Sequence, residues 1–173
     1  MVDHETFSQL LNLDECLSLH KDARKLLTHT TSRAEVSVVG KISGVECKGL
    51  IDLVNPKINL IADIKTTRRI TKATYERDAR EHGTPFQLAF YERLYLDATG
   101  ERPRHAIITY ETSPPHEFSL YYPDADWIDI GHEQVDRALD LYKQYQEDDF
   151  WPTKQNGKGE VLSAPSWLKR KRQ

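Results

Sequence analysis

The chain has 173 residues, of which 38% are hydrophobic and 29% are charged, with a formal net charge of −3. This balance is typical of one globular domain with its own core, and two cysteines are too few for a disulfide framework, a four-thiolate zinc site or an iron–sulfur cluster. Because no apolar run approaches the roughly 18 residues of a membrane span and residues 1–5 do not resemble a secretory signal, we expect a cytoplasmic protein without membrane contacts.

The first half of the chain changes from a helical to a strand pattern. Residues 4–29 have helical spacing and predict one helix or two, with Asp14 as a candidate cap for the second. Strands are predicted at residues 34–40, 45–54 and 58–66, with turn residues at 55–57 between the last two. The N-terminal half should therefore place helical segments before a run of three strands.

The second half returns to a helical period. A charged helix is predicted at residues 71–81, and a second at 84–98 with Thr84 as cap and Pro85 in its first turn. Strands at 104–111 and 117–122 and a long helix at 125–147 follow. The order predicts an α/β domain over residues 1–150, with a central mixed β-sheet flanked by helices. Residues 151–173 are predicted to be an irregular basic tail.

Two acidic residues and a lysine stand on neighbouring predicted strands. Asp63 and Lys65 lie two positions apart and therefore point to the same face of their strand. A carboxylate and an ammonium on a strand of Ile and Leu are costly unless they serve each other or an ion. Asp52, on the preceding strand, is the natural partner for a shared site.

The register of the two strands decides whether these carboxylates meet. In a simple antiparallel hairpin, Asp52 shares a face with Asp63 only if paired residue numbers have an odd sum, as when Val54 pairs with Asn59 around a four-residue loop. A three-residue loop would separate them unless a bulge intervened. We predict the four-residue arrangement or a bulge.

Two converging carboxylates without a nearby His or Cys cluster form a site of hard oxygen ligands, which suits Mg²⁺ or Mn²⁺. Such ions neutralise a scissile phosphate and activate water, and Lys65 could orient that water. The alternative is a surface ion pair between Asp63 and Lys65 on an edge strand. The chain has no Gly-rich phosphate loop ending in Lys-Ser or Lys-Thr, so no bound nucleotide is expected.

The combined motif resembles the PD-(D/E)XK nuclease superfamily. It consists of Gly49-Leu50-Ile51-Asp52, a short turn, Asp63-Ile64-Lys65-Thr66-Thr67, and then Gln87 and Tyr91 four residues apart on a predicted helix. The resemblance covers roughly residues 35–145 and is nearest to the RecE-like and RecB-like exonucleases. It implies a restriction-endonuclease-like core. It also implies a Mg²⁺- or Mn²⁺-dependent exonuclease that degrades linear double-stranded DNA from its ends for recombination or repair.

The resemblance also implies roles for individual residues. Asp52, Asp63 and the backbone carbonyl of Ile64 would bind the metal, and Lys65 would be the catalytic lysine. Gln87 and Tyr91 would support the active site or contact DNA. Similar nucleases process ends in phage-infected or bacterial cells, form rings around DNA and work with single-strand annealing proteins, so a homo-oligomeric ring and such a partner are expected.

The sequence departs from the family pattern in its N-terminal part. Family members often supply a further His or Glu ligand from an N-terminal helix, and no such motif can be placed here. His20 and Glu35 are the main candidates, with His4 and His29 as further histidines of that region. This gap leaves open a degenerate nuclease fold that only binds DNA or a protein, and an endonuclease of the same fold remains a second alternative.

Basic residues follow the predicted catalytic strand, although DNA-binding proteins are usually more basic overall than this chain. They could track a DNA backbone, or they could form a solvated helix face, because Glu76, Asp78 and Glu81 alternate with them. The candidate DNA-binding residues are Thr66, Thr67, Arg68, Arg69, Lys72 and Arg77.

Overall fold

The computed structural model describes residues 4–68, 71–114 and 116–153 together with 159, 161 and 163; side chains of residues 4–10 and 12 are outside this description. Arg69, named above as a candidate DNA contact, and most of the predicted basic tail lie outside the described residues. The chain divides into two compact units, residues 1–139 and 140–173. The division falls inside the last helix and before the expected end of the domain at residue 150.

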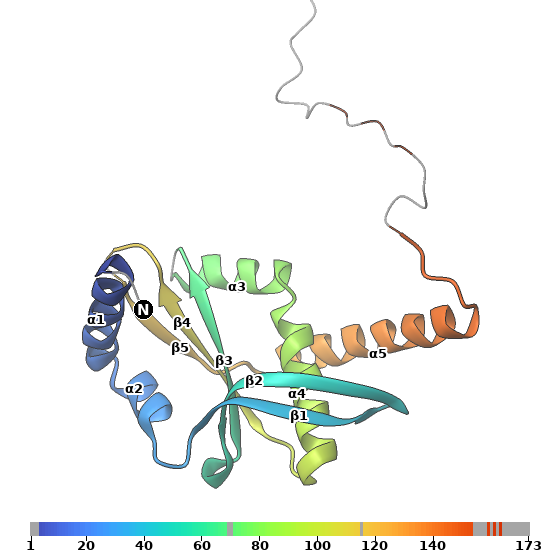
Figure 1. The fold of residues 1–173 in the computed structure, drawn as a ribbon, viewed down its shortest axis with the longest axis horizontal. Coiled ribbons are helices and arrows are strands. Elements are labelled where there is room, and N and C mark those ends of the chain that lie inside the picture. Colours follow the sequence, from blue (N-terminus) through green and yellow to red (C-terminus); the bar gives the residue numbers. More distant parts are fainter. Residues whose placement is uncertain are drawn as a thin grey trace, which may run out of the picture. The chain divides into compact units, whose positions relative to one another are not determined.

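A five-stranded mixed sheet forms the centre of the first unit (Figure 1). Its strands lie in chain order: β1 (Arg33–Ile42), β2 (Val45–Asn55), β3 (Leu60–Thr67), β4 (Arg104–Glu111) and β5 (Phe118–Tyr121). Only β3 and β4 run parallel, and the other neighbours are antiparallel. The parallel pair requires a crossover, which α3 (Lys72–Glu81) and α4 (Thr84–Thr99) provide.

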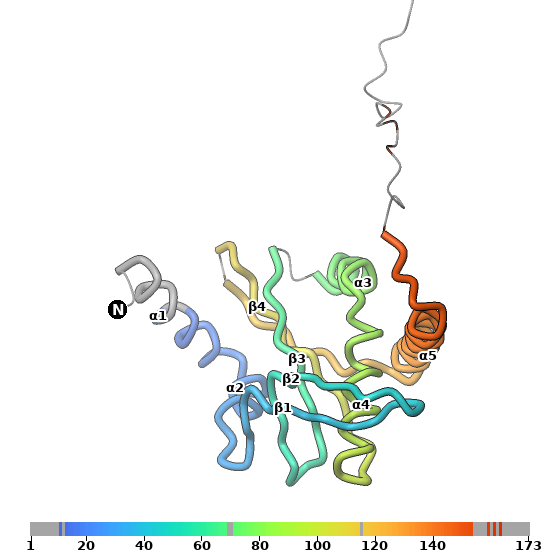
Figure 2. The backbone as a smooth tube through the Cα atoms, turned by 45° about the vertical axis from the view of Figure 1, so that its right-hand side comes forward, coloured from blue at the N-terminus to red at the C-terminus, as the bar shows by residue number. Residues whose placement is uncertain are grey.

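The helices cover both faces of the sheet, as Figure 2 also shows. The N-terminal helices α1 (His4–Leu19) and α2 (Lys21–Thr28) bring Leu17, Ala23 and Leu26 against Leu53 and Ala62. On the other face, α3 and α4 cover Ile61 and Ile107, joined by the first part of α5 (Ala125–Glu147). The expected flanked mixed sheet is confirmed.

Two helix starts differ from the sequence expectations. Asp14 lies inside α1, and α2 is instead capped by His20, whose Nδ1 accepts a hydrogen bond from Ala23 N at 3.2 Å. Thr84 is the first residue of α4, and the cap is Gly83, whose φ of 73° is left-handed. Glycine reaches that conformation without strain, so the reversal between α3 and α4 selects it over a hydrogen-bonding side chain.

Glycine also allows α5 to approach α4 closely. A Cβ built on Gly131 would lie 2.0 Å from the Pro85 carbonyl oxygen. Val135 and Leu139 continue the same contact into the core beside Ala89 and Leu94. Position 131 therefore needs a residue without a side chain for α5 to pack there.

No described helix has the length and apolar character needed to cross a bilayer.

Candidate active site

The strand register brings the two predicted carboxylates together. Asn55 pairs with Leu60 and Leu53 with Ala62 around a four-residue connection, so paired numbers have an odd sum, as predicted. Val54 pairs with Ile61, two residues beyond the Asn59 of the example, and a shift of two keeps the same faces together. The ladder stops at Leu53, and the Asp52 Oδ2 accepts the hydrogen bond of Ile64 N at 2.7 Å in place of a backbone carbonyl.

The strands are distorted at Asp52. Glu35 stands opposite Asp52 in the β1–β2 register but has a left-handed φ of 54°, and the pairing is missing from the ladder. Ile51 packs in the core beneath α4, whereas Leu53, two positions on, packs in the core beneath α2. Alternation would place both on one face, so β2 turns at Asp52. Distortions of this kind re-aim side chains beside active sites.

Asp63 is buried in the centre of the sheet. It is 1% exposed and lies on β3, between β2 and β4. The alternative of a surface ion pair on an edge strand is therefore wrong. Lys65 nevertheless is its partner: Nζ donates to Asp63 Oδ1 at 3.0 Å.

A chain of hydrogen bonds continues from Lys65 to α4. Lys65 Nζ donates to Gln87 Oε1 at 2.7 Å, and Gln87 Nε2 donates to the Tyr91 hydroxyl at 3.2 Å. Because Gln87 and Tyr91 are four residues apart, they share a helix face. Gly49 gives the tyrosine room, since a Cβ there would come within 2.9 Å of the Tyr91 ring. The polar residues of the predicted motif thus form one connected set: Asp52, Asp63, Lys65, Gln87 and Tyr91.

The negative charge of Asp63 is only partly compensated by its surroundings. Burial raises the pKa of Asp63 from 3.8 to about 6; Lys65 opposes the rise, and the charge of Asp52 and a hydrogen bond with it add to it. Asp63 Oδ2 is buried and makes no hydrogen bond, although Lys65 Nζ lies 2.9 Å away as its ion-pair partner. An unsatisfied buried carboxylate oxygen beside a second carboxylate fits a hard divalent cation.

Two oxygens alone do not enclose a metal. Among the described residues, no group of three or more His, Cys, Asp or Glu side chains is arranged to hold one. Asp52 and Asp63 would be the side-chain ligands, with water and backbone oxygen completing the shell, as Mg²⁺ accepts. The role of the Ile64 carbonyl stays a prediction.

The proposed N-terminal ligands are not brought to the carboxylates. The His20 ring caps α2, whose Ala23 and Leu26 pack on the sheet face opposite α3 and α4. The His29 ring contacts Thr31, and the His4 side chain lies outside the described residues. Glu35 is exposed and stands opposite Asp52 in register, but its left-handed backbone breaks the pairing.

A cavity of about 540 Å³ opens beside Lys65. Thr66, Thr67 and Arg68 line it, together with Tyr75 and Thr84. A phosphate contact by the first three stays a prediction. Burial raises the pKa of Tyr75, and the charge of Asp63 adds to the rise, which the nearby Thr84 opposes. The Tyr75 hydroxyl is buried and makes no hydrogen bond among the described residues. The sequence did not predict Tyr75 as part of this cavity. An aromatic ring in an otherwise charged helix was the pattern that could have indicated it.

Two basic candidates already have acidic neighbours on α3. Lys72 Nζ lies 3.6 Å from Glu76, one helical turn away, and Arg77 Nε lies 3.6 Å from Asp78. These contacts agree with the solvated-face interpretation. Pairs this exposed are weak, so a DNA contact by either residue stays a prediction.

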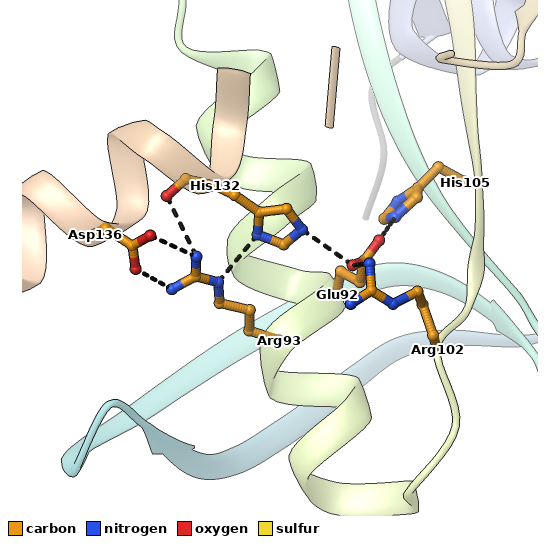
Figure 3. A network of polar contacts seen from close by, with 6 residues as sticks. All are labelled: Glu92, Arg93, Arg102, His105, His132 and Asp136. Carbon is orange, nitrogen blue, oxygen red and sulfur yellow. Dashed lines mark hydrogen bonds and ion pairs between the residues drawn. The ribbon is translucent and has the colours of Figure 1, made fainter. Parts of the chain in front are cut away.

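A second buried carboxylate, also missed by sequence analysis, lies next to Tyr91 on α4 (Figure 3). Glu92 contacts His105 Nε2 at 2.7 Å, His132 Nε2 at 3.1 Å and Arg102 Nη1 at 3.0 Å. Burial acts to raise the pKa of Glu92, but the hydrogen bond with His105 and the charges of His105, Arg102 and His132 bring it below its ordinary value.

The outer part of this cluster fixes a histidine tautomer. Arg93 Nε donates to His132 Nδ1 at 3.0 Å, and because guanidinium nitrogens only donate, the His132 proton is on Nε2, facing Glu92. Arg93 also binds Asp136. The cluster ties α4 to β4 and α5 and thereby supports the helix that carries Gln87.

A solved structure shares this fold. A crystal structure of a "Putative exonuclease" from Eubacterium rectale has a TM-score of 0.67 at 16% identity over 91% of this chain, which spans 63% of that structure's length. The crystal structure of the protein SSO0001 has a TM-score of 0.40 at 16% identity, over 70% of this chain and 56% of the other, too low to carry an argument.

Comparison with curated proteins found no match. A family model described as "PDDEXK-like domain of unknown function (DUF3799)" matches residues 2–165, nearly the whole chain. The motif residues and the mixed sheet that carries them agree with that description. The chain therefore belongs to this family, within the PD-(D/E)XK nuclease superfamily.

Proposed function

We propose that this protein is a divalent-metal-dependent deoxyribonuclease that degrades linear double-stranded DNA from its ends. The observation that carries the proposal is the meeting of Asp52, Asp63 and Lys65, with one Asp63 oxygen buried and unsatisfied. A cation held there would neutralise a scissile phosphate and lower the pKa of bound water. The family assignment supports nuclease chemistry, whereas end-directed cleavage rests on resemblance.

The side chains have distinct parts in this proposal. Asp52 and Asp63 supply the negative oxygens, and the hydrogen bond from Ile64 N holds Asp52 in place. Lys65 Nζ lies 2.9 Å from Asp63 Oδ2, and Lys65 also lines the adjoining cavity. There its positive charge would stabilise negative charge that develops on a phosphate. Gln87 orients Lys65, and Tyr91 orients Gln87.

The adjoining cavity provides a place for the DNA backbone. Thr66, Thr67 and Arg68 line it next to Lys65. Hydroxyl and guanidinium groups are common phosphate contacts, so the strand is expected to leave the carboxylates through this cavity. Ring assembly and an annealing partner stay predictions from resemblance.

The test compares linear and circular duplexes incubated with Mg²⁺, using wild type, Asp63→Ala and Lys65→Ala. Loss of linear DNA alone, abolished in both variants, supports the proposal. Lys41→Ala is the matched control, because that lysine is exposed and its ion pair is with exposed Glu46. Nicked circles would indicate an endonuclease, and DNA binding without any cleavage would indicate a degenerate fold.

A further inference from the structure

A second cavity, of about 360 Å³, lies on the same sheet face as the carboxylates. Four aromatic residues line it, together with the apolar Ile107, Leu120 and Pro123; the aromatic ones are Tyr75, Tyr121, Tyr122 and Trp127. Neither the motif nor the proposed chemistry uses it. Tyr75 is buried, Tyr121 and Trp127 are half-buried, and Tyr122 is 63% exposed. The cavity therefore joins an exposed ring to aromatic side chains of the core, and ligand sites are commonly lined by aromatic side chains with a few polar groups.

The sheet register places this aromatic cavity relative to the active site. Asp63 pairs with Ile107 on β4, and Ile107 pairs with Tyr121 on β5. Residues in one cross-strand row point to one face, so Tyr121 and Asp63 face the same side. Two strand spacings separate them, about 10 Å.

Tyr75 connects the two cavities. It lines both the one beside Lys65 and the aromatic one. Its ring stacks on Tyr121 with centroids 5.0 Å apart and planes 6° apart, and the pair packs over Ile107. A DNA strand bound beside Lys65 would therefore continue into the aromatic cavity.

We infer that the aromatic cavity binds an unpaired nucleobase of the DNA strand being cut. The inference rests on the proposed nuclease function and extends it to the form of the substrate. Bases stack on aromatic side chains without sequence preference, and a base still stacked in a duplex could not enter a cavity. Stacked bases rise 3.4 Å each along a strand, so about 10 Å places the base within about three nucleotides of the scissile phosphate.

The rim of the cavity suits a base rather than an apolar peptide. Lys72, Glu76 and Asp124 surround the aromatic walls and offer donors and acceptors to base edges. Lys72 also provides positive charge for the attached backbone, although Glu76 shares it. The substrate should thus be a frayed or overhanging end, where unpairing costs least.

The test uses oligonucleotides with one 2-aminopurine, whose fluorescence falls when it stacks, placed in turn at each of several positions of a short overhang. The full-length chain carries Asp63→Asn so that the DNA stays intact. Quenching is expected at one or two adjacent positions. Tyr122→Ala and Trp127→Ala should remove it and weaken binding about tenfold. Tyr142→Ala is the control, because that tyrosine is 41% exposed and does not line the cavity.

Quenching at no position, or quenching that survives both substitutions, would overturn the inference. The outcome is separate from that of the proposed function. Cleavage by wild type without quenching refutes the base site alone. Quenching without cleavage by wild type refutes the nuclease and leaves the base site standing.

Discussion

Two buried carboxylates, Asp63 and Glu92, face opposite electrostatic surroundings. They are 1% and 3% exposed. Glu92 has three cationic or hydrogen-bonding partners and a lowered pKa, whereas Asp63 has one lysine, a second carboxylate nearby and a pKa raised to about 6. A satisfied carboxylate stabilises a fold, and an unsatisfied one stores free energy that a ligand can release. Under the proposed function, we expect Glu92 to serve the structure and Asp63 the chemistry.

The largest expected effect is on catalytic activity, which should depend on Asp63 and not on Glu92. Asp63→Asn should lower kcat on linear DNA about a thousandfold or more, because a lost metal ligand costs several kcal/mol of transition-state stabilisation and about 4 kcal/mol is a factor of a thousand. Glu92→Gln, assayed below its melting temperature, should stay within about tenfold of wild type. Equal losses in both variants would break the comparison.

For stability we expect the reverse, with the larger loss on substitution of Glu92. Glu92→Gln should lower the free energy of unfolding by about 3 kcal/mol, because Arg102 and the two histidines lose the charge that compensates them. Urea denaturation measures it. Glu133→Gln, an exposed position on α5, is the control and should change little. A Glu92 variant as stable as wild type would show that the cluster does not stabilise the fold.

Gln87 should have a smaller effect, confined to turnover. Gln87→Leu removes the acceptor that holds Lys65 Nζ, so kcat should fall about 10- to 100-fold with little change in KM. Gln87→Glu keeps an acceptor and should recover part of the rate. If Gln87→Leu instead raises KM with kcat unchanged, the residue binds DNA and does not position Lys65.

The smallest effect is a pH dependence of stability. The Asp63 carboxyl binds its proton more tightly in the fold, with a pKa of about 6, than in the unfolded chain, near 3.8. Its contribution is therefore favourable below pH 4 and is lost as pH rises through 6. Without metal, Asp63→Asn should be more stable than wild type at pH 8, and the difference should shrink as pH falls below 6 and disappear only below pH 4. A constant difference would mean that the Asp63 charge costs nothing.

Most of the fold and of the motif could be predicted from short stretches of the sequence. Strand alternation around Asp63 and Lys65, the turn at residues 55–57 and the spacing of Gln87 and Tyr91 are short-range patterns, and the structure connects them as predicted. Most element bounds shifted by only one or two residues.

The remainder depended on contacts between distant segments. In the sequence Glu92 is an ordinary helical glutamate. Its partners His105 and His132 come from β4 and α5 and are near it only in the folded chain. Tyr75 reads as a helix residue until β5 places Tyr121 against its ring. The cap at His20 was missed because histidine is not among the preferred capping side chains. The cap at Gly83 was missed because the left-handed backbone before α4 selects glycine over a capping side chain.

Calorimetric titration of Mn²⁺ into the metal-free protein tests the central claim most directly. Wild type and Glu92→Gln should bind the ion with similar affinity, weakening as pH falls below 6 because protons compete for Asp63, and Asp63→Asn should show no binding. Equal binding by Asp63→Asn and wild type, or none by wild type even with DNA present, would contradict the assignment of Asp63 as a metal ligand.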